Sequence, residues 1–340
     1  MLRRVHPSII RVNNLLSHIF EKIIGLDNLL TAWKEFSRGK RKKRAVLEFE
    51  SRLLINLSSL HDDLASGNYR HGGYRAFNVC DPKPRNIHKA SVRDRLVHHA
   101  VYRILYLYFD QRFIADSYSC RRGKGTHKAL NRFRQFADSV SQNRTKTCWI
   151  LKGDIKKFFA SIDQRILKNL LHRAIADNRT LDLLNKIIDS FRIQPGKGLP
   201  LGNLTSQLLV NIYLNEFDQF IKHRLKVKHY LRYADDFIIM SNDRSWLSDE
   251  ISSIEKFLKD KLQLTFHPDK IYIKTLASGV DFLGWVNFSD HRVIRTVVKR
   301  RMLKKISQRS NPQVVQSYLG LLKHGNGYKL RQKIVDIINS

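Results

Sequence analysis

The sequence predicts an α+β fold in which helices back a small antiparallel sheet. Two β-prone runs, 230–233 and 237–240, flank the short stretch that holds two adjacent aspartates, which predicts a hairpin with acidic residues at its tip. A third short apolar run, 148–151, ends just before Gly153 and Asp154, as expected of a strand that presents a carboxylate at its end. Elsewhere, apolar residues recur at helical spacing.

The helices are predicted from this spacing and from end signals. Residues 97–108 have an apolar face of helical period. Ser161 and Gln164 have the spacing of a capping box, which predicts a helix start between them. Glycines in 196–202 prevent regular structure, and a further helix resumes near Thr205. The last 50 residues are expected to be helical and strongly basic.

Charge points to a polyanionic partner. The chain has 62 Lys and Arg against 30 Asp and Glu, a net charge of +32, which favours nucleic acid. An acidic membrane surface is the alternative, but no apolar run approaches the roughly 18 residues of a spanning helix. The start MLRRVHPSII lacks a signal-peptide core, so we expect no membrane association and a cytoplasmic location. The basic run SRGKRKKR, 37–44, fits a solvated loop or an RNA contact equally well.

The aspartates suggest a metal site. Adjacent carboxylates at a tight turn repel each other, and a bound cation would offset that repulsion. A set of Asp154, Asp235 and Asp236, without His or Cys, favours Mg²⁺ over zinc or copper. Such a set can hold two ions about 3.5 to 4 Å apart for nucleotidyl transfer, with Mn²⁺ able to replace Mg²⁺. A bare pair of aspartates would otherwise suggest only a solvated turn. No spacing of Cys80, Cys120 or Cys148 indicates zinc or a disulfide framework.

Three motifs, in this order, resemble those of reverse transcriptases. They are LKGDIKKFFASID at 151–163, GLPLGNLTSQ at 198–207 and YADD at 233–236. Flanking segments, DPKPRNIHKASVRDRLVHH at 81–99 and the later LTFHPDK and VDFLGW, are also similar to the family. The resemblance implies a right-hand polymerase fold of fingers, palm and thumb, and an RNA-directed DNA polymerase that makes cDNA.

The resemblance also implies a division of the chain. We expect a basic helical N-terminal extension over 1–80, fingers and palm over 81–285 with the palm core at about 148–285, and a helical thumb over 286–340.

Within that superfamily, the sequence looks most like reverse transcriptases of diversity-generating retroelements. Most reverse transcriptases, including group II intron and retron enzymes, carry QGxxxSP at the second motif, whereas this chain has Leu201 and Gln207 at the first and last positions. The segments 116–129 and 317–334 also resemble this subgroup. It implies mutagenic retrohoming with misincorporation opposite template adenines. The alternatives are a retron or group II intron type enzyme, a noncatalytic RNA-binding protein, and an RNA-copying RNA polymerase.

By resemblance, Asp154, Asp235 and Asp236 are catalytic and bind metal, with Asp154 and Asp235 as direct ligands and Asp236 acting on the local field. Phe159 matches the gate that excludes ribonucleotides, although core packing is an alternative role. Lys270 matches a palm lysine near the leaving pyrophosphate, although a solvated strand end would suit it equally well.

Further residues are expected to bind the incoming dNTP. Arg85 would clamp the triphosphate, with Lys83 as a helper. Arg93 and Arg95 could contact nucleotide or template phosphates, or form surface ion pairs. Leu201 and Gln207 should lie beside the nascent base pair. An apolar Leu201 cannot offer the incoming nucleotide the contacts of a glutamine amide, so selection for correct base-pair geometry should be weaker.

Several partners are implied. They are a template RNA, a primer and its cDNA, dNTPs, and a basic helical accessory protein oligomer. A bacterial or phage origin also follows from the resemblance. The helical tail, with Lys299, Arg300, Lys304 and Lys305 on its polar side, could follow a template-primer backbone.

Overall fold

The computed structural model describes residues 11–12, 15–80, 84–308 and 311–339. The chain divides into two compact units. Unit 1 contains the described residues of 1–114, 156–220 and 257–265, and unit 2 contains those of 115–155, 221–256 and 266–340. The chain therefore crosses between the units several times, and each is described by itself below.

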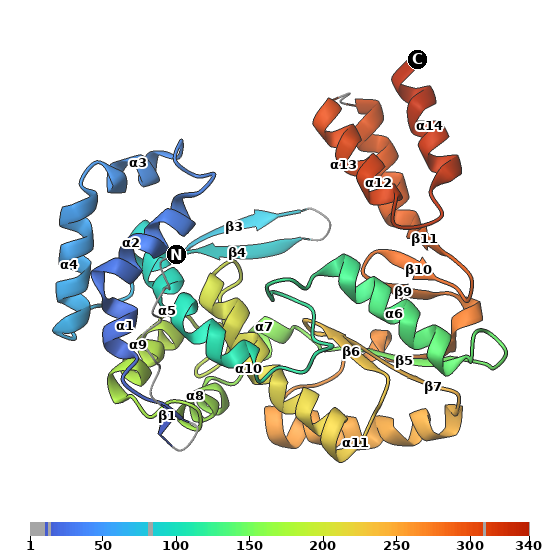
Figure 1. Ribbon diagram of the computed structural model, residues 1–340, viewed down its shortest axis with the longest axis horizontal. Coiled ribbons are helices and arrows are strands. Elements are labelled where there is room, and N and C mark those ends of the chain that lie inside the picture. Colours follow the sequence, from blue (N-terminus) through green and yellow to red (C-terminus); the bar gives the residue numbers. More distant parts are fainter. Residues whose placement is uncertain (1–10, 13–14, 81–83, 309–310, 340) are drawn as a thin grey trace, which may run out of the picture. The chain divides into compact units, whose positions relative to one another are not determined.

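Unit 1 is largely helical (Figure 1). Its core is formed where α2, α5 and α10 pack together, with Leu29, Leu96 and Leu209 among the buried residues. The helices of unit 1 are α1 (Phe20–Ile24), α2 (Leu26–Ser37), α3 (Arg44–Glu50), α4 (Leu53–Ala65), α5 (Val92–Asp110), α7 (Phe158–Ser161), α8 (Gln164–His172), α9 (Asn178–Asp189) and α10 (Leu204–Gln219).

Two small hairpins complete this unit. The first pairs β1 (Arg11–Val12) with β2 (Leu15–Leu16). The second pairs β3 (Arg75–Val79) with β4 (Arg85–Lys89), and it projects from the helices of unit 1 (Figure 1). Most side chains of this two-stranded hairpin are exposed.

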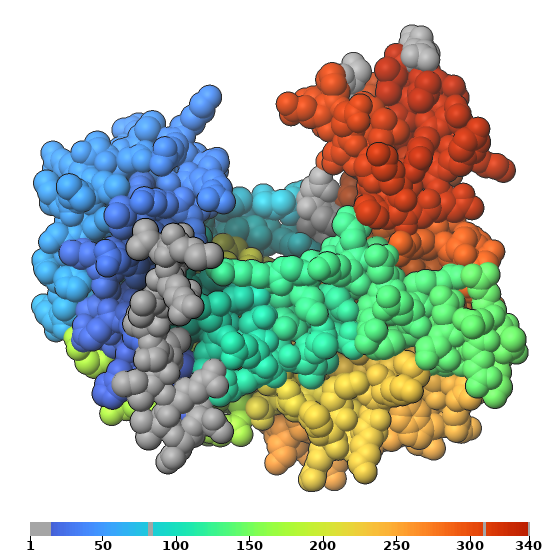
Figure 2. All heavy atoms as spheres, in the orientation of Figure 1, coloured from blue at the N-terminus to red at the C-terminus, as the bar shows by residue number. Residues whose placement is uncertain are grey.

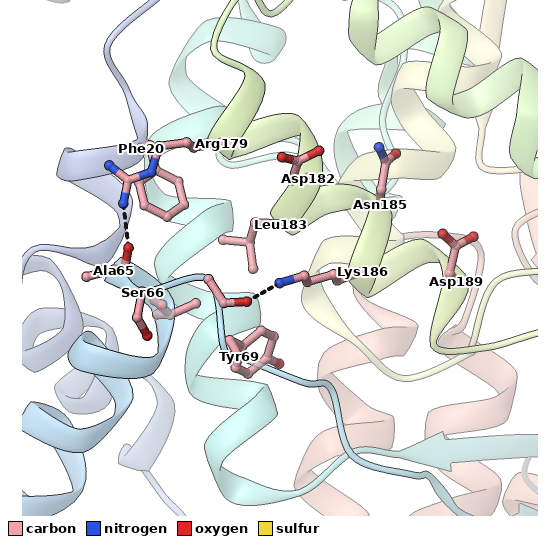
Figure 3. A pocket seen from close by; sticks show the side chains of 12 residues that line it. Phe20, Ala65, Ser66, Tyr69, Arg179, Asp182, Leu183, Asn185, Lys186 and Asp189 are labelled. Carbon is pink, nitrogen blue, oxygen red and sulfur yellow. Dashed lines mark hydrogen bonds between the residues drawn. The ribbon is translucent and has the colours of Figure 1, made fainter.

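The N-terminal helices pack against α9 around a cavity of about 630 Å³ (Figure 3). On its wall, the Arg179 guanidinium donates to the Ala65 carbonyl at 2.8 Å and pairs with Glu21. Lys186 Nζ donates to the Gly67 carbonyl at 2.6 Å. These contacts join α1 and α4 to α9, so the N-terminal helices are part of unit 1.

Unit 2 is built on a four-stranded antiparallel sheet in the order β6-β7-β5-β8. Its strands are β5 (Trp149–Asp154), β6 (Tyr230–Tyr233), β7 (Asp236–Ser241) and β8 (Tyr272–Thr275). The helix α6 (Thr126–Val140) packs against β6 and β7. The predicted α+β class with an antiparallel sheet is confirmed, and the predicted hairpin is β6–β7.

A second sheet, in the order β11-β10-β9, carries the C-terminal helices. Figure 2 shows these helices as one red lobe. A continuous core joins α6, both sheets and the C-terminal helices through Phe133, Ile238, Phe282 and Met302. The elements are β9 (Val280–Phe282), β10 (Trp285–Asn287), β11 (Arg292–Ile294), α12 (Thr296–Gln308), α13 (Pro312–Leu322) and α14 (Tyr328–Asn339).

The remaining helix, α11 (Arg244–Leu262), runs from unit 2 into unit 1. Three single turns are also present: η1 (Phe220–Arg224), η2 (Pro268–Lys270) and η3 (Leu276–Ser278).

One predicted helix start is wrong in detail. Ser161 does not cap the helix that follows, because it is the last residue of α7 and its hydroxyl donates to the Lys156 carbonyl at 3.1 Å. The cap of α8 is Asp163, whose carboxylate accepts from the Ile166 amide at 3.0 Å. An aspartate directly before the helix satisfies an otherwise unpaired amide. By contrast, the helix predicted at 97–108 lies within α5, which Ser91 caps.

Candidate active site

Strand register brings the three aspartates to one end of the four-stranded sheet. Asp154, at the end of β5, is the direct cross-strand partner of Asp236, the first residue of β7. Asp235 lies in the two-residue turn of the β6–β7 hairpin, and its carbonyl accepts a hydrogen bond from the Ile155 amide at 3.3 Å. The turn uses Ala234 at φ 55°, a left-handed conformation that costs a residue with a Cβ some energy.

Asp236 lies beside a lysine and has one buried carboxylate oxygen. Its Oδ2 lies 3.2 Å from Lys152 Nζ, while its Oδ1 is buried and has no hydrogen-bond partner among the described residues. Burial raises the pKa of Asp236 to about 6. Lys152 opposes that rise, whereas the charges of Asp154 and Asp235 add to it. The Asp236 carboxyl therefore loses its proton at a higher pH than an ordinary aspartate does.

Lys152 was not predicted to belong to this site. It precedes Asp154 by two residues and therefore lies on the same face of β5. Its side chain is buried, and its Nζ also donates to the Asp281 carbonyl at 2.7 Å. Strand alternation could have suggested its position, but the approach of Asp281 in β9 joins residues 129 positions apart.

Lys270 lies beside Asp154. Its Nζ is 2.9 Å from Asp154 Oδ1, and η2 places it there, because the His267 amide donates to the Asp154 carbonyl at 2.8 Å. The structure therefore brings Lys270 to the carboxylates. Its predicted contact with a leaving pyrophosphate stays a prediction.

A divalent cation fits the chemistry of these residues. The donor set consists only of carboxylates, and one buried oxygen, Asp236 Oδ1, accepts no hydrogen bond from the described residues. Hard cations such as Mg²⁺ prefer such oxygen ligands. As they stand, however, no three His, Cys, Asp or Glu side chains converge into a metal-binding group in the described part of the chain. Asp154 and Asp236 point instead to the two lysines, so holding metal requires their side chains to turn.

Most of the residues expected to bind dNTP belong to unit 1. Arg85 is the exposed first residue of β4, cross-strand from Val79. Its strand is tied to the loop before α10, because the His88 amide donates to the Leu201 carbonyl at 2.9 Å. A Cβ added at Gly202 would lie 2.7 Å from Ile87 Cγ2, so this close approach requires glycine. Lys83 lies outside the described residues.

Phe159 and Gln207 occupy different local settings in unit 1. Phe159 is in α7 and is only half-buried, whereas the neighbouring Phe158 is 3% exposed and packs in the core. Gln207 lies in the first turn of α10, with its amide bonded to the Asn203 carbonyl at 3.3 Å. Arg85, Phe159, Leu201 and Gln207 are thus held within one unit, and the aspartates with Lys270 in the other.

Comparison with known proteins identifies the family. The family model of reverse transcriptases, described as RNA-dependent DNA polymerases, matches residues 78–286. The chain belongs to the reverse transcriptase family. The predicted RNA-directed DNA polymerase is therefore confirmed at the level of the family.

Among curated relatives, the reverse transcriptase chain is 27% identical over 286 residues to protein YkfC of Escherichia coli K12, covering 72% of this chain and 73% of YkfC. It is 25% identical over 314 residues to the group II intron-encoded protein LtrA of Lactococcus lactis, covering 72% of this chain and 49% of LtrA. Its homologues thus include proteins of group II introns, and the chain spans about half the length of LtrA.

A solved structure confirms the fold. The apo telomerase of Candida tropicalis, truncated from its C-terminal domain, superposes with a TM-score of 0.50 at 14% identity, covering 67% of this chain and 55% of the telomerase chain. At that identity the likeness concerns the fold alone, and it is consistent with the right-hand polymerase fold expected of this reverse transcriptase. Across the described residues, no helix combines the length and apolar character needed to cross a membrane.

Proposed function

We propose that this protein copies a template RNA into cDNA by two-metal nucleotidyl transfer. The observation that carries the proposal is the register of β5 and β7, which sets Asp154 opposite Asp236 beside the turn that holds Asp235. Membership of the reverse transcriptase family supports the same reading. The substrates are an RNA template, a primer and dNTPs.

In this proposal Asp154, Asp235 and Asp236 hold Mg²⁺, which Mn²⁺ can replace. Bound there, the cations would activate the primer hydroxyl and stabilise the leaving pyrophosphate. Asp154 and Asp235 are the direct ligands in this proposal, and Asp236 contributes to the local electrostatic field. Lys270 is paired with Asp154 at 2.9 Å. If Asp154 held a cation, Lys270 would be free to donate to a pyrophosphate oxygen.

The other predicted residues select and orient the nucleotide. Arg85, with Lys83 as helper, donates to the triphosphate, since a guanidinium fork matches phosphate oxygens. Phe159, half-buried in α7, blocks a ribose 2′-hydroxyl. Leu201 and Gln207 lie beside the nascent base pair in this proposal. The hydrogen bond from the His88 amide of β4 to the Leu201 carbonyl supports their action together with Arg85.

We place the protein in a diversity-generating retroelement, working with a basic helical accessory oligomer in the cytoplasm of a bacterium or of a phage host. Leu201 and Gln207 support this subgroup, because the commoner pattern has Gln and Pro at these positions. A group II intron or retron type enzyme is the second candidate, favoured by the similarity to LtrA.

Sequencing the cDNA from primer extension on an RNA template with Mg²⁺ distinguishes the two candidates. Errors concentrated opposite template adenines support mutagenic retrohoming. Error rates that are equal at all four template bases would remove that function and leave the second candidate. The double substitution Leu201→Gln with Gln207→Pro gives the loop the commoner residues. It should lower the errors opposite template adenines if Leu201 and Gln207 cause them.

A further inference from the structure

A group of five cations on unit 1 has no acidic partner among the residues that the structure describes. Lys40 and Lys43 come from the loop 38–43, which projects from α2 and α3 (Figure 1). Arg75 and Lys89 come from the β3–β4 hairpin, and Arg95 from α5. No ion pair to any of the five is found among the described residues. We call these five residues the fingers cation cluster.

Neighbouring cations behave differently. Arg41 pairs with Glu50 at 3.6 Å and Arg44 with Glu48 at 2.7 Å, both within the same loop and helix. Arg93, two residues before Arg95, pairs with Asp63. Acidic residues are therefore available in this region, yet they neutralise other cations and leave the cluster uncompensated. Arg93 takes the ion-pair role that the sequence left open, whereas Arg95 does not.

The charges of the cluster act on one another. Arg75 and Lys89 are direct cross-strand partners, an arrangement of like charges that destabilises a hairpin. Burial and then the charges of Arg95, Lys43 and Arg75 lower the pKa of Lys89. Burial and then Arg95 and Lys43 likewise lower the pKa of Lys40. Cations from the loop, the hairpin and α5 therefore lower one another's pKa values.

One buried ring holds two of these cations in place. Lys40 Nζ lies 4.6 Å and the Arg95 guanidinium carbon 4.8 Å from the centre of the Phe36 ring. Lys40 also donates to the Phe36 carbonyl at 2.9 Å, and Arg95 to the Ser91 carbonyl at 3.3 Å. Phe36 is 1% exposed. Both cations are therefore held close together despite their mutual repulsion.

We propose that the fingers cation cluster binds the sugar-phosphate backbone of a single-stranded RNA segment. The five cations come from a loop, a hairpin and a helix. Such an arrangement can contact several phosphates of one strand, which suits a nucleic-acid strand better than a single small anion. Lysines present mobile point charges, and Arg75 and Arg95 add planar donor forks, so backbone phosphates can be held without base readout. This inference rests on the proposed function for its RNA partner.

The test compares two double variants with the same change in net charge. Lys43→Gln with Lys89→Gln removes two cluster charges, and Arg41→Gln with Arg44→Gln removes two paired charges nearby. Binding of a labelled single-stranded RNA oligonucleotide is measured by fluorescence anisotropy over a range of salt concentrations. Primer extension with Mg²⁺ is measured separately on an excess of primer-template, so failure of the polymerase and failure of the cluster are read independently.

The cluster variant should lose RNA affinity by about tenfold or more and lower the slope of log affinity against log salt by ~1.4, for two lost contacts at ~0.7 each. The paired-charge variant should keep nearly the parental affinity and slope. Without RNA, the cluster variant should unfold at the same temperature as the parent or higher, because repulsion is removed.

Equal losses in the two variants would overturn the proposal, because net charge alone would then explain binding. Unchanged RNA affinity in the cluster variant would also overturn it. If binding to vesicles that contain phosphatidylserine, measured by co-sedimentation, were lost while RNA affinity was unchanged, the cluster would be a membrane contact instead. A lower unfolding temperature of the cluster variant without RNA would contradict the repulsion from which the site is inferred.

Discussion

At the scale of single residues, the protonation of Asp236 is the most informative feature of the site. Its Oδ1 is buried, and desolvation raises its pKa from 3.8 to about 6. The folded state therefore binds a proton more tightly than the unfolded state does. The stabilisation from that proton is fully present below the unfolded pKa and is lost as pH rises through about 6.

This sign gives a test with Asp236→Asn in metal-free buffer. The amide cannot ionise, so the difference in free energy of unfolding, variant minus parent, should increase between about pH 4 and pH 7. A shift from 3.8 to about 6 corresponds to ~3 kcal/mol at ~1.4 kcal/mol per unit. Urea denaturation at several pH values measures it. A difference that is flat with pH would mean that Asp236 titrates normally.

Two adjacent phenylalanines allow the proposed gate to be separated from core packing. Phe158→Ala should destabilise the protein by ~3 to 5 kcal/mol, because Phe158 is 3% exposed. Phe159→Ala should cost far less stability, because Phe159 is half-buried, and should raise the incorporation of ribonucleotides relative to dNTPs. Thermal unfolding and single-nucleotide extension with rGTP and dGTP give the two readouts. Unchanged sugar selection in Phe159→Ala would assign the residue to packing.

At the scale of elements, a buried network fixes the start of α10. Thr205 Oγ1 lies 2.5 Å from His98 Nδ1 in α5, and His98 Nε2 lies 3.1 Å from His71 Nε2. His71 Nδ1 lies 2.6 Å from the Gly72 carbonyl and must donate to it, so His71 Nε2 accepts from His98. His98 Nδ1 then accepts from Thr205. Burial is the main cause that lowers the pKa of His98 to about 3, which keeps His98 neutral.

Breaking that network should disturb the loop that holds Leu201 and Gln207. Thr205→Val leaves His98 Nδ1 buried without a donor, so we expect a loss of ~1 to 3 kcal/mol in stability and an altered error rate. Thr205→Ser keeps the hydroxyl and should restore the error rate. Urea denaturation and cDNA sequencing measure the two effects. If Thr205→Val copied RNA with the parental error rate, the network would have only a structural role.

The elements also show what sequence patterns can and cannot predict. The strand bounds of the β6–β7 hairpin were predicted to within one residue, because two short β-prone runs enclose a polar turn. The cap of α8 was misplaced from Asp163 to Ser161, since both residues are favoured at helix starts. The contact between Thr205 and His98 joins residues 107 positions apart, and no local pattern indicates such a pair.

At the scale of the whole molecule, the net charge of +32 acts in two opposite directions. It attracts RNA, and it also makes the folded chain repel itself. Added monovalent salt should therefore weaken RNA binding and raise the thermal unfolding temperature of the free protein. Anisotropy and calorimetry over the same salt series measure both. Salt that left the unfolding temperature unchanged would show that the charges are too well spaced to destabilise the fold.

The division into two units is another property that the sequence did not reveal. The predicted domains follow one another along the chain. Each compact unit, by contrast, is built from separate stretches, and 156–220 and 257–265 pack with 1–114. Motif resemblance locates functional residues along the chain. Packing of distant segments decides which of them share a unit, and that depends on contacts between residues far apart in sequence.

The central claim is that Asp154, Asp235 and Asp236 support metal-dependent DNA synthesis on RNA. The most direct test is single-dNTP addition to a primer on an RNA template, with and without Mg²⁺, comparing the parent with Asp235→Asn, which keeps the size of the side chain. We expect Mg²⁺-dependent addition by the parent, a loss of at least about a hundredfold in the variant, and equal RNA affinity of both proteins. Addition by Asp235→Asn at the parental rate would contradict the account.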